Sequence, residues 1–260
     1  MWTLLHLLAC GDTSAATDQV ADTDTGSTSS PSDSPSPTPT ADTADTGPTT
    51  ISVPLPGWGT ITGDCGVLDD DEWTASSSFR FRNTLDLTGL TWAGEDTPLS
   101  EGALRILEDG TLGGSSESSE ALAYDVLDRC ELAALLDTER SIRYADADGR
   151  KTDLRAEIDE REVGVSVTRA MTFVSPEQRC GTPGDTLATL VAEKVAELQE
   201  SEANQSPKTP WERSLLSIIA CDDAHATVVE DTWEGLDAAV RSNAILVLTV
   251  LEGNDAFAFE

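Results

Sequence analysis

His225 is the only histidine in residues 51–260, and it stands beside two aspartates, Asp222 and Asp223. An imidazole and two carboxylates are side-chain types that bind zinc or form part of a catalytic triad. All three stand at the start of a predicted helix, where an aspartate commonly accepts hydrogen bonds from free backbone N–H groups. No G-x-S-x-G motif supplies a nucleophile for a triad. We therefore interpret the two aspartates as helix N-caps.

A second group of polar side chains lies on two neighbouring segments with an alternating pattern. Asp153 and Glu157 share one face of the first segment, because successive side chains of a strand point to opposite faces. Ser166 and Thr168 share a face of the second segment, and valines occupy its other face. These strand faces are the strongest candidate for a functional surface.

The elements that must position these residues follow from hydrophobic periodicity and from turn and capping residues. In chain order we predict a helix over Glu101–Asp109 capped by Ser100, a helix from Ser115 or Ser116 to Ala134, strands over Arg140–Ala145, Thr152–Ile158 and Glu162–Arg169, a helix capped by Asp185 or Thr186, a strand over Ser214–Ala220, a helix over Asp223–Arg241 and a strand over Ala244–Leu251.

The connections between these elements predict the topology. Asp148-Gly149 and the short link 159–161 are turn signals, so the first three strands form an antiparallel meander. The last two strands are continuous apolar runs separated by a helix, which is typical of parallel pairing. We therefore expect an α/β domain over residues 99–260, with a mixed sheet and flanking helices. A β-rich N-terminal segment, residues 51–98, precedes it.

The element order over residues 115–252 resembles the core of the restriction-endonuclease-like, or PD-(D/E)xK, nucleases. In that family an aspartate on the second meander strand and an acid-x-lysine motif on the third hold a divalent ion that activates water. The resemblance places Asp153, in Lys151-Thr152-Asp153-Leu154, at the aspartate position. It places Ser166 and Thr168 at the acid and lysine positions. Two neutral hydroxyls cannot supply the charges of that pair, so the resemblance implies a degenerate site.

A rebuilt active site remains an alternative. Asp153 and Glu157 could hold a Mg or Mn ion, Glu117 or Glu120 from the preceding helix could approach them, and Arg169 could replace the lysine. This alternative is a metal-dependent phosphodiesterase. Otherwise we expect no cofactor.

The net charge argues against a nucleic-acid partner. The chain carries a formal charge of -32, and residues 1–50 hold seven aspartates without Lys or Arg, which leaves 41 acidic against 16 basic side chains in the remainder. Proteins that bind nucleic acid usually present a basic face to the phosphates. We therefore expect no nucleic-acid partner.

One of the five cysteines lies before the domain, and four lie within it. Cys10 precedes the domain, and the other four, Cys65, Cys130, Cys180 and Cys221, form an even set without CxxC spacing. In an oxidising compartment this set allows two disulfides in any of three connectivities.

The N-terminus indicates export. A short apolar stretch ends in Leu7-Leu8-Ala9-Cys10, which resembles the lipobox of bacterial lipoproteins, and residues 1–10 are then the signal peptide with its lipidation site at Cys10. No Lys or Arg precedes the apolar stretch, and a start codon upstream of Met1 would account for this. Residues 11–50 consist almost wholly of Gly, Ala, Ser, Thr, Pro and Asp, which is typical of a disordered tether.

Together these features predict a protein anchored by lipid in the bacterial cell envelope, facing the periplasm or the outer surface. Its cargo would be an acidic, non-catalytic α/β domain with a protein or ligand partner that the sequence does not identify. The metal-dependent hydrolase that uses Asp153 and Glu157 is the alternative.

Overall fold

The computed structural model describes residues 51–55, 58–112, 114–172 and 180–259. The predicted signal peptide, Cys10 and the tether over residues 11–50 lie outside the described residues. The described residues belong to one compact unit. Within it a single mixed sheet of eight strands has the order β1-β2-β3-β8-β7-β6-β5-β4. The predicted α/β class with a mixed sheet is confirmed.

The strands run in both directions across the sheet. Their bounds are β1 Ile51–Leu55, β2 Gly59–Gly63, β3 Phe79–Asp86, β4 Ala134–Thr138, β5 Leu154–Ile158, β6 Arg161–Ala170, β7 Arg213–Ala220 and β8 Ala244–Glu252. The pairs β1–β2, β2–β3, β4–β5 and β5–β6 are antiparallel, and β3–β8, β8–β7 and β7–β6 are parallel. The β-rich N-terminal segment therefore extends the same sheet.

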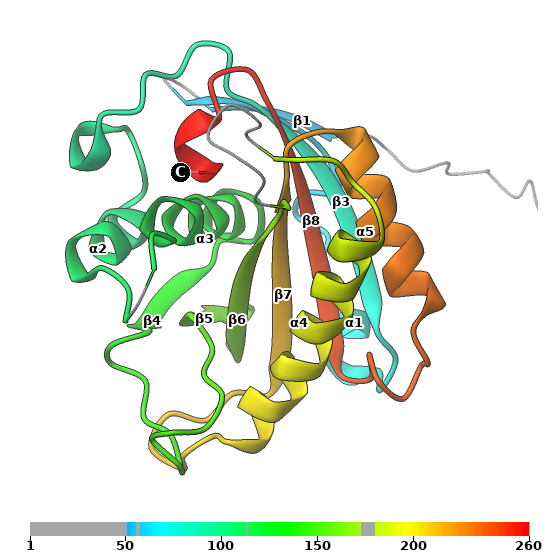
Figure 1. The fold of residues 1–260 in the computed structure, drawn as a ribbon. Coiled ribbons are helices and arrows are strands. Elements are labelled where there is room, and N and C mark those ends of the chain that lie inside the picture. The colour runs from blue at the N-terminus through cyan, green and yellow to red at the C-terminus, as the bar shows by residue number, and fades with distance from the viewer. Residues whose placement is uncertain (1–50, 56–57, 113, 173–179, 260) are drawn as a thin grey trace, which may run out of the picture. The chain divides into compact units, whose positions relative to one another are not determined.

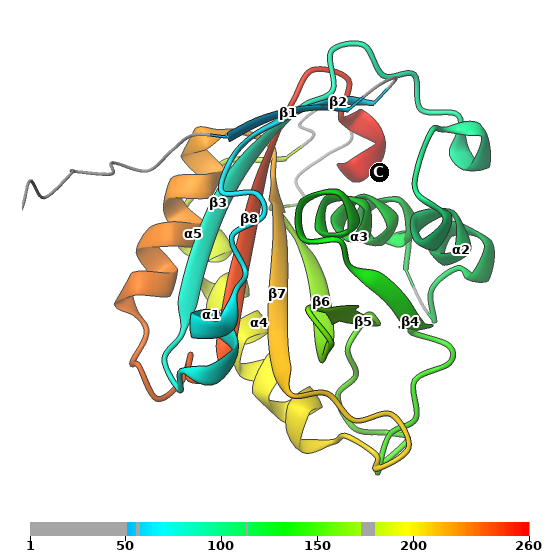
Figure 2. The same cartoon turned by 180° about the vertical axis from the view of Figure 1, so that it is seen from behind.

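Helices connect the strands and cover both faces of the sheet. Their bounds are α1 Asp70–Thr74, α2 Glu101–Asp109, α3 Glu117–Glu131, α4 Asp185–Ala203 and α5 Asp223–Gly235, with short 3₁₀ helices η1 Gly94–Asp96 and η2 Ala256–Phe259. Helices α2 and α3 lie on one side of the sheet, and α4 and α5 lie on the other (Figures 1 and 2). Among the described residues, no helix has the length and apolar character needed to cross a membrane.

Alternation along the central strands explains the two cores. On β8, Ile245 and Val247 pack in the core below α3, whereas Leu246 and Leu248 pack in the core below α4 and α5. Both faces of β7 and β8 are buried, which the apolar runs predicted, and the two strands are parallel as expected.

The first meander strand was predicted in the wrong place. The structure has a strand at Ala134–Thr138, not at Arg140–Ala145. Helix α3 ends at Glu131 because Leu132 adopts a left-handed conformation, with φ of 54°, so Ala134 belongs to the strand and not to the helix. The backbone N–H of Ser141 then donates to Thr138 O at 2.9 Å and turns the chain away from the sheet.

Two other boundaries differ from the prediction. Helix α4 begins after Gly184 without a side-chain cap, so neither Asp185 nor Thr186 caps it. Helix α5 ends at Gly235, six residues before the predicted end at Arg241, because Leu236 is extended. Ser100 does cap α2, since its side chain accepts from the N–H of Ala103 as predicted.

The link between β5 and β6 is a tight hairpin. Ile158 and Arg161 pair across it, and both residues between them, Asp159 and Glu160, have positive φ angles of 50° and 64°. This conformation matches the right-handed twist of a two-residue hairpin. The turn holds β5 and β6 in register and so places Asp153 opposite Ser166 at the far end of the pair.

Candidate functional site

Asp153 stands directly before β5, where the β5–β6 ladder ends. Its backbone N–H donates to Val165 O at 3.1 Å, and its Oδ2 accepts the backbone N–H of Val167 at 2.6 Å. The carboxylate therefore takes the place of a strand carbonyl and satisfies a backbone group that the ladder leaves open. Asp153 has a clear structural role, whatever else it does.

Glu120 lies in the first turn of α3, and its pKa responds to the charge of Asp153. Only 4% of Glu120 is exposed. Burial raises the pKa of Glu120 to about 8, and the negative charge of Asp153 contributes further, while a hydrogen bond with the Ser116 side chain lowers it. Two carboxyl groups from different elements thus lie close enough to repel each other.

The pKa of Asp153 responds to the same surroundings. Burial raises it to about 7, the hydrogen bond from Val167 opposes this shift, and Glu139 raises it further. Lys194 of α4 lowers it. Near neutral pH the two carboxyl groups therefore retain protons that exposed carboxyl groups would have lost. Such groups can donate or accept a proton, which is the property that general acid–base chemistry uses.

Three hydroxyl groups lie near Asp153. The Thr152 and Ser166 hydroxyl oxygens are 3.2 Å apart, and the Tyr144 hydroxyl accepts from Thr152 N–H at 2.9 Å and donates to Thr152 O at 3.0 Å. Burial raises the pKa of Tyr144, and the charges of Asp153 and Glu139 add to this effect. The predicted Ser166 is thus at the site, but as a neutral hydrogen-bonding neighbour.

The remaining predicted residues are dispersed. Glu157 is exposed and lies four residues along β5, about 13 Å from Asp153 at strand spacing, opposite Ala134 and Glu162. Thr168 continues beyond Ser166 on β6, in register with Ile218 of β7. The structure does not bring Glu157 to the site.

Arg169 has a different position from the one that the resemblance implied. Its Nη1 donates to Ser115 O at 3.4 Å, so the side chain lies at the start of α3. On β6, Arg169 shares the face of the valines, which points toward α3, whereas Ser166 and Thr168 point to the opposite face, toward α4. The cation whose charge acts on Asp153 is Lys194.

Glu139 and Lys194 are the residues that sequence reasoning missed. Glu139 lies in the turn after β4, which was predicted to lie elsewhere. Lys194 stands in the middle of α4, and its Nζ is 2.7 Å from Glu197 Oε2. Their position near Asp153 depends on how the helix and the turn pack against the sheet. No spacing in the sequence predicts that position.

The site does not form a three-ligand metal centre. Among the described residues, no group of three or more His, Cys, Asp or Glu side chains could hold a metal ion. Glu120 and Asp153 would be the two ligands available if an ion bound there. The third ligand expected from Glu157 is too far along the strand.

The predicted N-cap is confirmed for Asp222 but not for Asp223, which is the first residue of α5 and accepts from Arg82 Nη2 at 2.6 Å. Asp222 Oδ1 accepts the N–H of His225 at 2.9 Å and lies 2.7 Å from its Nδ1, and Asp222 is the N-cap of α5. The imidazole is 2% exposed, and its Nε2 is 3.3 Å from Cys180 O. Both ring nitrogens therefore have partners inside the fold.

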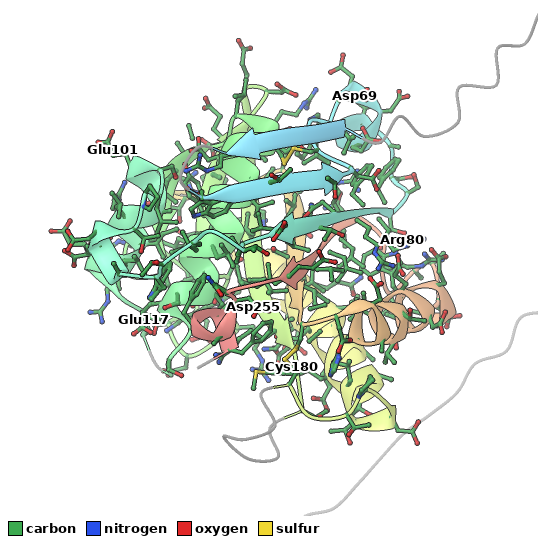
Figure 3. All side chains as sticks on the ribbon, turned by 90° about the horizontal axis from the view of Figure 1, so that it is seen from above. Asp69, Arg80, Glu101, Glu117, Cys180 and Asp255 are labelled. Carbon is green, nitrogen blue, oxygen red and sulfur yellow. A yellow bond between two sulfur atoms is a disulfide. The ribbon has the colours of Figure 1, made fainter. Side chains whose placement is uncertain are left out.

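The four cysteines of the domain form two disulfides, Cys65–Cys130 and Cys180–Cys221. The first joins the loop after β2 to α3, and the second joins the segment before α4 to the end of β7. The second bridge appears as a yellow bond at Cys180 in Figure 3. The even cysteine set was predicted, and the structure selects one of the three connectivities.

No family model and no solved structure matches the chain. A protein of Dictyostelium discoideum described as "AAC-rich mRNA clone AAC4 protein" is 30% identical over 155 residues. The match covers 58% of this chain and 22% of that protein, so the chain spans about a fifth of its relative. The description of the relative states no activity.

Proposed function

We propose that this protein is an envelope lipoprotein, anchored through Cys10, whose acidic α/β domain binds a ligand without catalysing a reaction. The observation that carries the proposal is the use of the cysteines. All four cysteines of the domain are paired in disulfides, which form and persist in oxidising compartments. The fifth, Cys10, is the one at the lipobox.

The domain also supports the proposed relation to the restriction-endonuclease-like fold. Helix α3, the β4–β5–β6 meander, α4, β7, α5 and β8 follow in the order that the resemblance implies. Strand β5 is antiparallel to its neighbours, and β6, β7 and β8 are parallel. The acid and lysine positions on β6 remain Ser166 and Thr168, which is why we propose binding rather than catalysis.

The anchor can be tested by mass spectrometry. The full-length gene, with its genomic upstream sequence, would be expressed in a Gram-negative host, and the mature N-terminus would be analysed. We expect a chain that begins at Cys10 and carries a diacylglycerol and acyl chains. Cys10→Ala is the control and should remain unprocessed. A mature wild-type chain with an unmodified residue 10 would refute the proposal.

A metal-dependent phosphodiesterase is the second candidate, and one observation favours it. The charge of Asp153 acts on the buried Glu120, and the charge of Lys194 acts on Asp153. The test is cleavage of DNA, RNA or a bis-phosphodiester with Mg or Mn ions. Activity that is lost in Asp153→Asn and kept in Glu157→Gln would establish this function. Absence of turnover in the wild type supports the binding function.

A further inference from the structure

A small basic cavity opens beside the carboxyl site, in the loop between β4 and β5. It has a volume of about 230 Å³. Three of its lining residues are cations, Arg140, Arg143 and Lys151, and Glu139 is the acid among them. The lining of the cavity is therefore positively charged, although acidic side chains greatly outnumber basic ones in the domain as a whole.

Two of these cations have no carboxylate partner. Among the described residues, the structure records no ion pair for Arg143 or Lys151, and both are exposed. The next cation along the chain, Arg150, differs from them because it pairs with Glu197 at 3.0 Å and Glu200 at 3.4 Å. Charges that stay unpaired in a strongly acidic protein are available to an anion from outside.

Arg140 is held in place without losing its charge. Its Nε donates to Gly110 O at 3.3 Å and its Nη2 donates to Thr111 O at 2.8 Å. Two carbonyls fix the guanidinium plane and use only part of its five N–H donors. A fixed, partly free guanidinium is the group that binds phosphate with high geometric specificity.

The acid in the cavity is already engaged. Glu139 Oε2 accepts the backbone N–H of Leu112 at 2.6 Å. The cavity also has an apolar part, formed by Leu112, which is 52% exposed, and by the buried Ile142. A ligand that fits would carry a compact dianion and a small carbon skeleton.

We infer that this cavity binds the phosphomonoester group of a small molecule. A phosphomonoester carries a charge of roughly -1.5 to -2 near pH 7. The three cations and one carboxylate of the cavity have a net positive charge of matching size. A nucleic acid would have to lay many further phosphates on an acidic surface, which repels them. The inference deepens the proposed binding function, rests on it and names its ligand class.

Calorimetric titration of the full-length chain with glycerol 3-phosphate at low salt would test the inference, with glycerol as the uncharged control. The chain would carry Cys10→Ala, so that no lipid anchor interferes. We expect binding of glycerol 3-phosphate and none of glycerol. Lys151→Gln and Arg143→Gln should each weaken binding about tenfold, since each removes a charge-assisted hydrogen bond.

Lys208→Gln is the matched control variant. Lys208 is also exposed, and it does not line the cavity. Lys208→Gln removes the same charge as Lys151→Gln. We therefore expect the affinity for glycerol 3-phosphate to change by no more than about twofold, the size of a general electrostatic effect. Failure of the wild type to bind, or an equal loss in Lys208→Gln and Lys151→Gln, would overturn the inference.

The phosphomonoester could be free or could be a lipid headgroup. Flotation with vesicles that contain phosphatidic acid distinguishes the two sources. Flotation that glycerol 3-phosphate reverses, and that Lys151→Gln abolishes, indicates a headgroup. Binding of glycerol 3-phosphate without flotation indicates a soluble ligand. Release of phosphate from glycerol 3-phosphate would contradict the proposed non-catalytic function and leave the binding site in place.

Discussion

The middle of the sheet and its β4–β5 end are built on different physical principles. Every residue of β7, and all but the last of β8, is buried, and most of their side chains are apolar. At the other end, β4 and β5 are five residues each and lie among ionisable groups, such as Glu120, Asp153 and Arg155. Burial of apolar area therefore stabilises the middle of the sheet. The β4–β5 end instead contains buried ionisable groups, which can take part in function but lower the stability of the fold.

The ion-pair pattern strengthens this contrast. Arg155 is 9% exposed, and it donates to Asp137 at 2.7 Å, Glu162 at 2.7 Å and Pro210 O at 3.0 Å. Arg155 therefore depends on partners from β4, β6 and the segment before β7. In the middle of the sheet the apolar side chains need only volume and shape to match.

The largest effect should come from the middle of the sheet. Leu246→Ala removes a fully buried side chain from β8, and we expect a loss of about 2–5 kcal/mol in the free energy of unfolding. Leu112→Ala, at a side chain that is 52% exposed, is the control and should cost less than about 0.5 kcal/mol. Urea unfolding monitored by tryptophan fluorescence measures both. Equal losses would remove the contrast.

The pH dependence of stability should report the end of the sheet. The pKa values of Glu120 and Asp153 are raised to about 8 and about 7 in the folded chain. Their contribution to stability is therefore complete below about pH 4 and is lost as the pH rises through 7 and 8. We expect a loss on the order of 2–4 kcal/mol between pH 5 and pH 8.5.

Glu120→Gln is the variant that checks this origin. Glutamine stays neutral at every pH, so the loss between pH 5 and pH 8.5 should fall to about half of the wild-type value. Unfolding in urea at the two pH values gives the difference directly. An unchanged pH dependence would show that Glu120 does not hold a proton in the folded chain.

A smaller effect should separate the structural role of Asp153 from its charge. Asp153→Ala leaves the partly buried N–H of Val167 without its acceptor, which should cost about 1–3 kcal/mol. Asp153→Asn keeps a side-chain oxygen and should cost less than about 1 kcal/mol at pH 8. Chemical unfolding measures the free energy of unfolding of both variants. Equal losses in Asp153→Ala and Asp153→Asn would mean that the carboxylate charge itself stabilises the fold.

The smallest effect on stability should come from the basic cavity. Arg143→Gln and Lys151→Gln alter exposed side chains, so each should change the free energy of unfolding by no more than about 0.5 kcal/mol. Thermal unfolding of both variants beside the wild type measures this. A larger loss would place these cations in the fold rather than in a binding site.

Much of the fold followed from local patterns in the sequence. The apolar runs of β7 and β8, the serine before α2 and the short link between β5 and β6 each determined an element or a turn, because burial, capping and tight-turn geometry act within a few residues. The even number of domain cysteines allowed two disulfides in an oxidising compartment.

Only the tertiary structure decided where β4 lies, which cysteines pair and which charges meet. Leu132 ends α3 in a left-handed conformation that its residue type does not favour, so the strand begins earlier than the pattern predicts. The charge of Asp153 acts on Glu120, which belongs to a different element, and Leu112 lines the basic cavity together with residues 139–151. Electrostatic interactions depend on distance and burial in space, and spacing along the sequence does not encode either.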